Sequence, residues 1–115
     1  MNQELKIGEV TLAGKLTSKK INEIGSDTLK MLNQLSQETD EVKIIANFDK
    51  SAEFTIDGTV SAVKWMKIVS FDRLVMVMMS DKLRSALEKI TKLSGKSEIV
   101  KFAESKKEAL KFLSS

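Results

Sequence analysis

Three carboxylates, Asp49, Glu53 and Asp57, lie close together in the polar segment FDKSAEFTIDGT. Carboxylates at such spacings can coordinate a cation or exchange protons with a substrate. A calcium-binding loop also requires a glycine and a closing glutamate at fixed offsets, and neither is in place here. We therefore predict a solvated acidic loop that holds no metal, and carboxylate-based catalysis at Asp49 and Asp57 is the weaker alternative.

The residue types that most often perform catalysis are missing, because the chain contains no histidine, cysteine or tyrosine. Histidine is the usual general base near neutral pH and the commonest metal ligand. Its absence together with that of cysteine excludes a Ser-His-Asp triad, a Cys-His dyad and ordinary zinc sites. The composition predicts a protein that binds rather than an enzyme, with no catalytic residues and no cofactor.

The sequence also predicts where the protein resides. A chain without cysteine has no disulfide framework, which is typical of a reducing compartment. The opening segment MNQELKIGEV has neither the basic nor the apolar region of a signal peptide. No apolar run approaches the roughly 20 residues that cross a bilayer. We expect a cytoplasmic protein with no integral membrane segment.

The net charge of +3 is unevenly distributed along the chain. Residues 1–60 carry seven lysines against ten acidic residues, whereas residues 61–115 carry twelve basic residues against six acidic ones. Because the basic residues alternate with acidic ones and no aromatic residues are placed to stack on bases, we expect no nucleic-acid binding. Four lysines form a stripe along the third predicted helix: Lys82, Lys89, Lys92 and Lys96. We favour the interpretation that this stripe faces water, and contact with anionic lipid is the alternative.

Hydrophobic periodicity switches repeatedly between the extended and the helical type. It predicts strands at about 5–14, 42–48, 74–79 and 99–102, alternating with helices at about 17–36, 58–70, 80–94 and 105–113. This alternation is typical of an α/β domain with a mostly parallel sheet. With no proline and five glycines there is no evident linker, so we predict a single domain over residues 1–115, with four to five strands and about four helices.

Local signals refine these elements. The first strand changes phase at Gly8-Glu9, which predicts a bulge or tight turn and makes the N-terminal segment either an edge strand or a hairpin. The run 74–79 is apolar throughout, as in a parallel strand that is covered on both faces. The predicted N-caps are Thr17 or Ser18, Asp57, Ser80 and Ser105, and Gly95 is the predicted stop of the third helix. That helix has a predicted inner face of Leu83, Ala86, Leu87, Ile90 and Leu93.

The second predicted helix has an unusually wide apolar surface, interrupted by a narrow polar stripe of Ser61, Lys64 and Lys67. A helix lying on a sheet normally needs a smaller apolar arc. Either its own domain covers it on two sides, or part of the helix forms an interface, in which case a homodimer is one outcome. The apolar residues are Val60, Ala62, Val63, Trp65, Met66, Ile68 and Val69.

Functional sites in open parallel sheets lie beyond the carboxyl ends of the strands. Here that edge comprises residues 49–59, Ser80 and 103–105. A phosphate on Thr59 would lie near the N-terminus of the second helix, where free N–H groups and the helix dipole favour an anion. The simpler and favoured interpretation is that Asp57 is an ordinary N-cap and that Thr59 is merely an early helical residue.

Three segments resemble the STAS family, and in particular its stand-alone SpoIIAA-like branch: LAGKLTSKKI, RLVMVMMSDKLRSALEKI and FAESKKEALKFL. They match the turn into the first helix, the buried strand with its Ser-capped third helix, and the closing strand and helix. The resemblance spans about residues 10–113. It implies the SpoIIAA-like α/β fold and a regulatory domain that binds an anti-sigma-like kinase as its partner.

The same resemblance implies a candidate switch. Anti-sigma antagonists of this family carry an Asp-Ser pair at the start of the second helix, and the kinase phosphorylates the Ser. Asp57 matches the Asp, Gly58 stands where the Ser would be, and Thr59 is the nearest hydroxyl. The broad fold group also includes the CRAL-TRIO lipid-binding domains, which implies an apolar ligand as the alternative function.

Two binding hypotheses follow from the sequence. The first is a regulatory module that docks a protein partner, or a second copy of itself, through residues 49–69. The second is a domain that binds a lipid or small apolar ligand, suggested by the Met- and Phe-rich residues Phe48, Phe54, Trp65, Met66 and 76–79. The residues predicted to bind the partner or ligand are Asp49, Phe54, Asp57, Gly58, Trp65 and Ser80.

Overall fold

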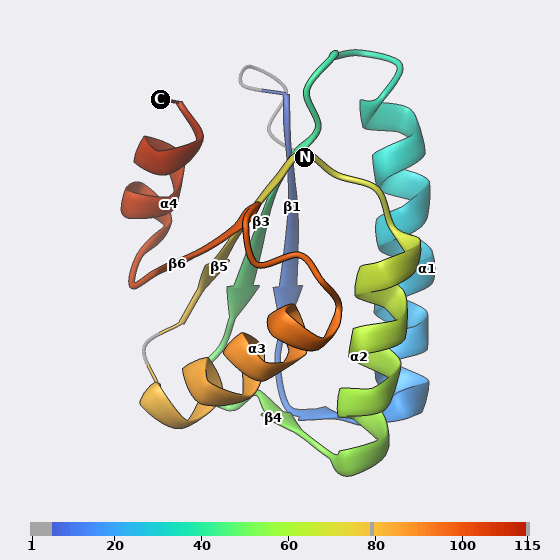
Figure 1. The fold of residues 1–115 in the computed structure, drawn as a ribbon, viewed down its shortest axis with the longest axis vertical. Helices are drawn as coiled ribbons and strands as arrows, with labels where there is room; N and C mark the ends of the chain where they lie inside the picture. The colour runs from blue at the N-terminus through green and yellow to red at the C-terminus, as the bar shows by residue number, and fades with distance from the viewer. Residues whose placement is uncertain (1–5, 79, 115) are drawn as a thin grey trace.

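The computed structural model describes residues 6–78 and 80–114. Four parallel strands form the main sheet in the spatial order β1-β3-β5-β6 (Figure 1). The predicted α/β class and the alternation of strands and helices are confirmed. The elements are β1 (Ile7–Leu12), α1 (Ser18–Leu35), β3 (Lys43–Phe48), α2 (Ile56–Ile68), β5 (Arg73–Val77), α3 (Asp81–Leu93), β6 (Val100–Ala103) and α4 (Lys106–Leu113).

The helices divide unequally between the two faces of the sheet (Figure 1). On one face α4 alone packs its Ala109 and Leu113 against Ile7, Ile45 and Val75 of the strands. The other face carries α1, α2 and α3, which surround a larger apolar cluster. Because β5 lies inside the sheet, its side chains are buried on both faces, as the apolar run predicts.

Side-chain caps fix most helix ends where the sequence predicts them. Thr17 caps α1 by accepting the Lys20 N–H, and Ser105 caps α4 by accepting the Glu108 N–H. At the end of α3, Gly95 has a φ of 74°, and the N–H groups of residues 95 and 96 donate to the carbonyls of Lys92 and Thr91. This is the Schellman arrangement, which favours glycine because its left-handed backbone strains other residues.

The N-terminal strand differs from one of its two predicted forms. In the described residues β1 is an edge strand whose register with β3 runs unbroken from Ile7 opposite Lys43 to Leu12 opposite Phe48, without a bulge or hairpin. The phase change at Gly8 arises because β1 buries Ile7 under α4 and Leu12 on the opposite face. Leu5 lies outside the described residues, as does Met79 at the end of the predicted third strand.

The region before α2 contains the main surprises. Two very short strands, β2 (Lys15–Leu16) and β4 (Glu53–Phe54), pair in parallel beside the main sheet. The second helix begins two residues earlier than predicted, and its N-cap is Thr55 and not Asp57. Thr55 takes this role because its hydroxyl accepts the Gly58 N–H, whereas Asp57 lies inside the first turn and bonds to α1.

Candidate functional site

Helix α2 packs beside α1 and against α3, as Figure 1 shows. Within the described chain, Gly58 is the one residue of α2 that is fully buried, and the inward-facing side chains of the helix are only half-buried. The wide apolar surface predicted for this helix is therefore partly covered by its own domain and partly exposed. The candidate site therefore has two parts, the half-buried inner side of α2 and its exposed outer side.

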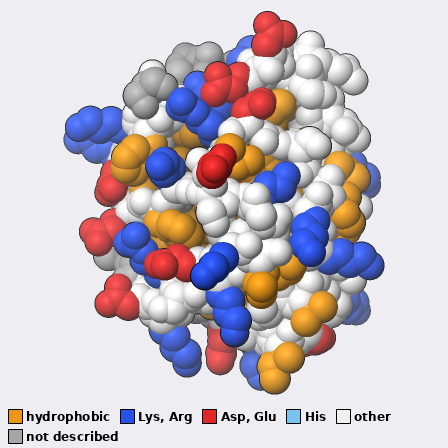
Figure 2. Space-filling view, in the orientation of Figure 1, with side chains coloured by type: hydrophobic (Ala, Val, Ile, Leu, Met, Phe, Trp, Pro, Cys, Tyr) orange, Lys and Arg blue, Asp and Glu red, His pale blue; other side chains and the backbone are white. Residues whose placement is uncertain are grey.

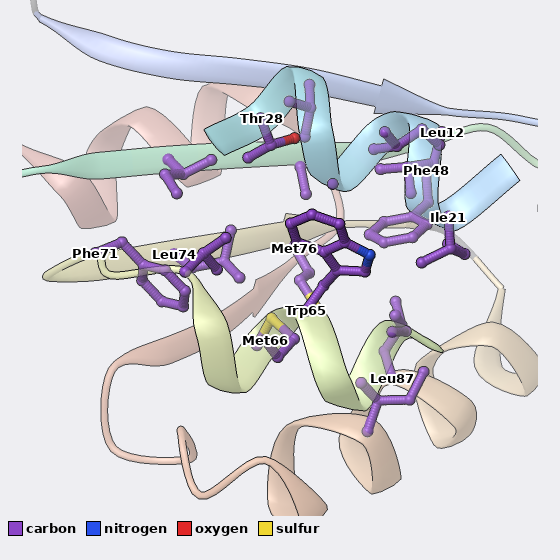
Figure 3. Close-up of a pocket in the computed structure, with 18 of the residues that line it drawn as sticks. Leu12, Ile21, Thr28, Phe48, Trp65, Met66, Phe71, Leu74, Met76 and Leu87 are labelled. Carbon is purple, nitrogen blue, oxygen red and sulfur yellow. The ribbon is translucent and has the colours of Figure 1, made fainter. Parts of the chain in front are cut away.

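An apolar cavity of about 120 Å³ lies between α1, α2, α3 and the sheet. Trp65 and Met66 of α2 point into this region, and Leu74 and Met76 of β5 and Leu87 of α3 line it (Figure 3). The predicted apolar residues Phe48 and Phe54 also line it, with their ring centroids 6.2 Å apart. Of the predicted Met- and Phe-rich residues, Phe48, Phe54, Trp65, Met66 and Met76 thus line one cavity, whereas Met78 does not.

Trp65 is held in a fixed orientation over this cavity. Its Nε1–H donates to Asn22 Oδ1 at 2.9 Å, and its ring lies against the backbone of α1 at Gly25. A Cβ atom at Gly25 would lie 2.3 Å from a ring carbon of Trp65, so glycine is required for this close helix approach. Neither Asn22 nor Gly25 was predicted as a site residue, although a glycine in the middle of a helix is a sequence signal for close packing.

The outer side of α2 is exposed and apolar. Ile56, Val60 and Ile68 have exposed fractions of 89%, 66% and 53%. Hydrophobic side chains are visible along the part of the surface that α2 forms in Figure 2. Lys64 and Lys67 are exposed between them, so basic side chains are interspersed with the apolar residues on this side. Sequence reasoning missed Ile56 because it was assigned to the preceding loop.

Asp57 joins the start of α2 to the start of α1. Its Oδ2 accepts the Ser18 N–H at 3.3 Å, and its Oδ1 accepts the Thr55 hydroxyl. The Ser18 and Ser61 hydroxyls share a further hydrogen bond of 2.7 Å between the same helices. The Thr55 hydroxyl bond, followed by the Ser18 N–H bond, lowers the pKa of Asp57 from its usual value.

Asp49 is occupied within its own loop. It accepts the Ser51 hydroxyl at 2.5 Å and the Ser51 N–H at 3.0 Å, and these two bonds lower the pKa of Asp49 from its usual value. In the described part of the chain, no three carboxylates come close enough to hold a metal ion. Asp49 and Asp57 therefore serve separate local hydrogen bonds rather than a common centre.

The candidate switch residues have well-defined surroundings. Thr59 is half-buried, and its hydroxyl donates to the Thr55 carbonyl at 2.9 Å. Gly58 lies directly against the backbone of β2, so a Cβ atom there would be 1.7 Å from the Leu16 carbonyl oxygen. A serine at position 58 would require α2 or β2 to move, because its Cβ would collide with the backbone carbonyl group of Leu16.

Ser80 and Thr59 line the same surface cleft, of about 530 Å³, at the carboxyl ends of the strands. Ser80 caps α3 by accepting the Leu83 N–H, as predicted. The structure thus places Thr59 with Ser80, and Phe54 with Trp65, whereas Asp49 and Asp57 are engaged in the loop and at the helix start. The predicted residues surround α2 but do not converge on one point.

The parallel sheet, whose strands alternate with helices along the chain, defines a STAS-type α/β domain. Helix α2 forms the centre of the candidate site. A family model described as SpoIIAA-like matches residues 7–114, and the chain belongs to this family. Members are generally non-enzymatic, and membership suggests a regulatory module of the anti-sigma-antagonist type. Neither the curated proteins nor the solved structures gave a match. No helix in the described residues is long and apolar enough to cross a membrane.

Proposed function

We propose that this chain is a single non-enzymatic regulatory domain that docks a protein partner through the outer side of α2 and the loop before it. One observation carries the proposal. Five large hydrophobic side chains are exposed among the described residues, and three of them, Ile56, Val60 and Ile68, lie on this one helix. Single exposed hydrophobic residues are ordinary, but a group on one element indicates an interaction surface.

The chemistry of this surface favours a particular kind of partner. An exposed apolar surface interspersed with Lys64 and Lys67 matches a partner surface on which apolar and acidic residues are mixed. Family membership supports an anti-sigma-like kinase as the partner. A second copy of the chain is the alternative, and sedimentation at micromolar concentration distinguishes a homodimer from a monomer that needs another protein.

The proposal also includes a phosphorylation switch, at Thr59 and not at the serine position of the family motif. Thr59 is the hydroxyl that a kinase would modify, because the close approach of Gly58 to Leu16 leaves no room for the serine of the family motif. The Thr59 side chain would first have to release the Thr55 carbonyl. Intact-mass measurement of protein from its native cells should show a phosphoryl adduct that is absent from Thr59→Ala.

Variants of α2 test the docking proposal. Val60→Glu should abolish capture of a stoichiometric partner by the purified chain, because it places a negative charge in the exposed apolar surface. Leu93→Glu is the matched control, since Leu93 is a similarly exposed apolar residue on α3, with an exposed fraction of 55% against 66% for Val60. Both variants should melt close to the parent chain. Equal loss with both variants, or no partner and no self-association with the parent, contradicts the proposal.

A second candidate function, binding of a small apolar ligand, is supported by the cavity beneath Trp65. A dry apolar cavity of roughly 150 Å³ can bind benzene, so about 120 Å³ suits a ligand of that size or smaller. A lipid chain would require α2 to move outward. Native mass spectrometry of protein isolated without detergent tests this candidate, and a clean apo mass with no ligand-dependent rise in melting temperature contradicts it.

A further inference from the structure

A groove of about 490 Å³ lies where α3 meets β6, on a different side of α3 from the apolar cavity. Val100 and Phe102 of β6 form its apolar part, and Arg84, Thr91 and Lys92 are among the residues that α3 contributes. In Figure 2 the surface over α3 and β6 shows hydrophobic side chains set among basic and acidic ones. The proposed docking side of α2 does not include any of these residues.

The strand beside this groove has a free edge. β6 ends the sheet order, and in residues 6–78 and 80–114 no strand pairs with its outer side. The carbonyls of Ile99 and Ala103 accept N–H groups on the β5 side, at 3.0 and 3.1 Å. Since backbone groups alternate sides along a strand, Val100 and Phe102 direct theirs outward, where an added strand could pair with them.

A buried threonine lines the same groove. Thr91 is 3% exposed, and its Oγ1 has no hydrogen-bond partner among the described residues. A threonine within a helix commonly donates to the carbonyl four residues earlier, and a buried hydroxyl without any partner is destabilising. A ligand with a hydrogen-bonding group in this groove would satisfy it.

The rim of the groove is positively charged. Arg84 lies over the Phe102 ring, 5.4 Å from its centroid, and its Nε pairs with Glu88 at 3.1 Å. Lys89 and Lys92 remain as two further cations beside the groove. The lysine stripe predicted from the sequence is thereby divided, since Lys96 lies over the Phe71 ring and Lys82 lines the cleft beside Ser80.

We propose that this groove binds an extended acidic peptide, which adds as a strand to the free edge of β6. In this arrangement the peptide backbone pairs with Val100 and Phe102, and its alternate side chains lie over the groove on the α3 side. Carboxylates at those positions reach Lys89 and Lys92, and one of them accepts a hydrogen bond from the Thr91 hydroxyl. The partner is a protein segment with acidic residues at every second position. This site is independent of the docking side of α2.

A capped peptide of alternating glutamate and valine, about eight residues long, is the probe. Titration into ¹⁵N-labelled protein should shift the amide resonances of Thr91, Val100 and Phe102. Lys89→Glu combined with Lys92→Glu should raise the Kd about tenfold or more, whereas the same charge change at Lys107 and Lys111 on α4 should leave it unchanged. Thr91→Val, which keeps the side-chain shape, should raise the Kd about threefold or more without lowering the melting temperature.

Two altered peptides separate strand addition from simple charge attraction. N-methylation at alternate peptide residues removes the backbone donors and should abolish binding, and lysine in place of glutamate should do the same. Equal binding of either peptide overturns the proposal. So does the absence of shifts at β6 with millimolar acidic peptide, or a stronger response of the same residues to single-stranded oligothymidylate, which would make the groove a phosphate-binding surface.

Discussion

The two faces of the main sheet are covered in different ways. On the α4 face, one short helix buries the centre of the core, with Ile45 and Ala109 fully inaccessible to solvent and Leu113 almost so. A pocket of about 250 Å³ lies at the end of this helix, beside Phe112 and Leu113. On the opposite face, three helices leave a cavity of about 120 Å³ beneath α2. The difference indicates that α4 contributes mainly to stability, whereas α2 packs less tightly against the core than a helix with a purely structural role.

The largest expected effect contrasts core residues on the two faces. Ile45→Ala should lower the free energy of unfolding by about 4 kcal/mol, because Ile45 is completely buried in the middle of the sheet and its surroundings cannot collapse around the lost atoms. Met66→Ala on α2 should cost only about 1–2 kcal/mol, because Met66 is half-buried and already borders a cavity. Urea denaturation measures both values. Equal costs would mean that α2 is packed as tightly as α4.

The next effect concerns the contact between α2 and β2. Gly58→Ser should destabilise the protein by about 2–3 kcal/mol, because its Cβ would collide with the Leu16 carbonyl and neither backbone can move freely. Thr59→Ser in the same helix turn is the matched control and should cost less than about 1 kcal/mol. A Gly58→Ser protein that is as stable as the parent, or that gains phosphorylation at position 58, would show that this contact is not restrictive.

The comparison also explains which features could be predicted from the sequence. The caps at Thr17, Ser80 and Ser105 were predicted correctly because each depends on a side chain and an N–H group three residues apart. At α2 two cap-type residues compete, Thr55 and Asp57. The choice depends on Ser18, which is distant in the sequence and so invisible to a local rule.

Other features depend on shape and therefore had no sequence signal. The two-residue strands β2 and β4 are too short for any periodicity. The residue types around Trp65 predicted an apolar region, but whether it is filled depends on how closely α2 approaches the sheet. On α3 the predicted inner residue Leu93 is exposed, while Thr91 is buried, because the helix turns its last residues toward β6.

Filling the cavity should reduce the difference in packing between the two faces of the sheet. Ala62→Leu, on the half-buried side of α2 that lines the cavity, should recover about 1 kcal/mol and raise the melting temperature. It should also prevent binding of benzene-sized ligands. Destabilisation by this variant would mean that the cavity cannot accommodate the added atoms.

The smallest expected effect is the acid dependence of the link between α1 and α2. The Thr55 and Ser18 bonds lower the pKa of folded Asp57 below its usual 3.8, so their stabilisation is present above that value and is lost as the pH falls through the folded pKa. Asp57→Asn should therefore flatten the decline of melting temperature below about pH 4.

Asp49→Asn provides the comparison, because the Asp49 pKa is lowered in the same direction by bonds to Ser51 that stay within one loop. Thermal melts from pH 5 to pH 2, in steps of about half a unit, measure both. The two variants should flatten the decline of melting temperature with falling pH to the same extent, since both carboxylates are exposed. Amide hydrogen exchange should separate them, because Asp57→Asn should speed exchange in the first turn of α2, whereas Asp49→Asn should not. Unchanged exchange in Asp57→Asn would show that the Asp57 hydrogen bonds do not hold the first turn of α2 in place.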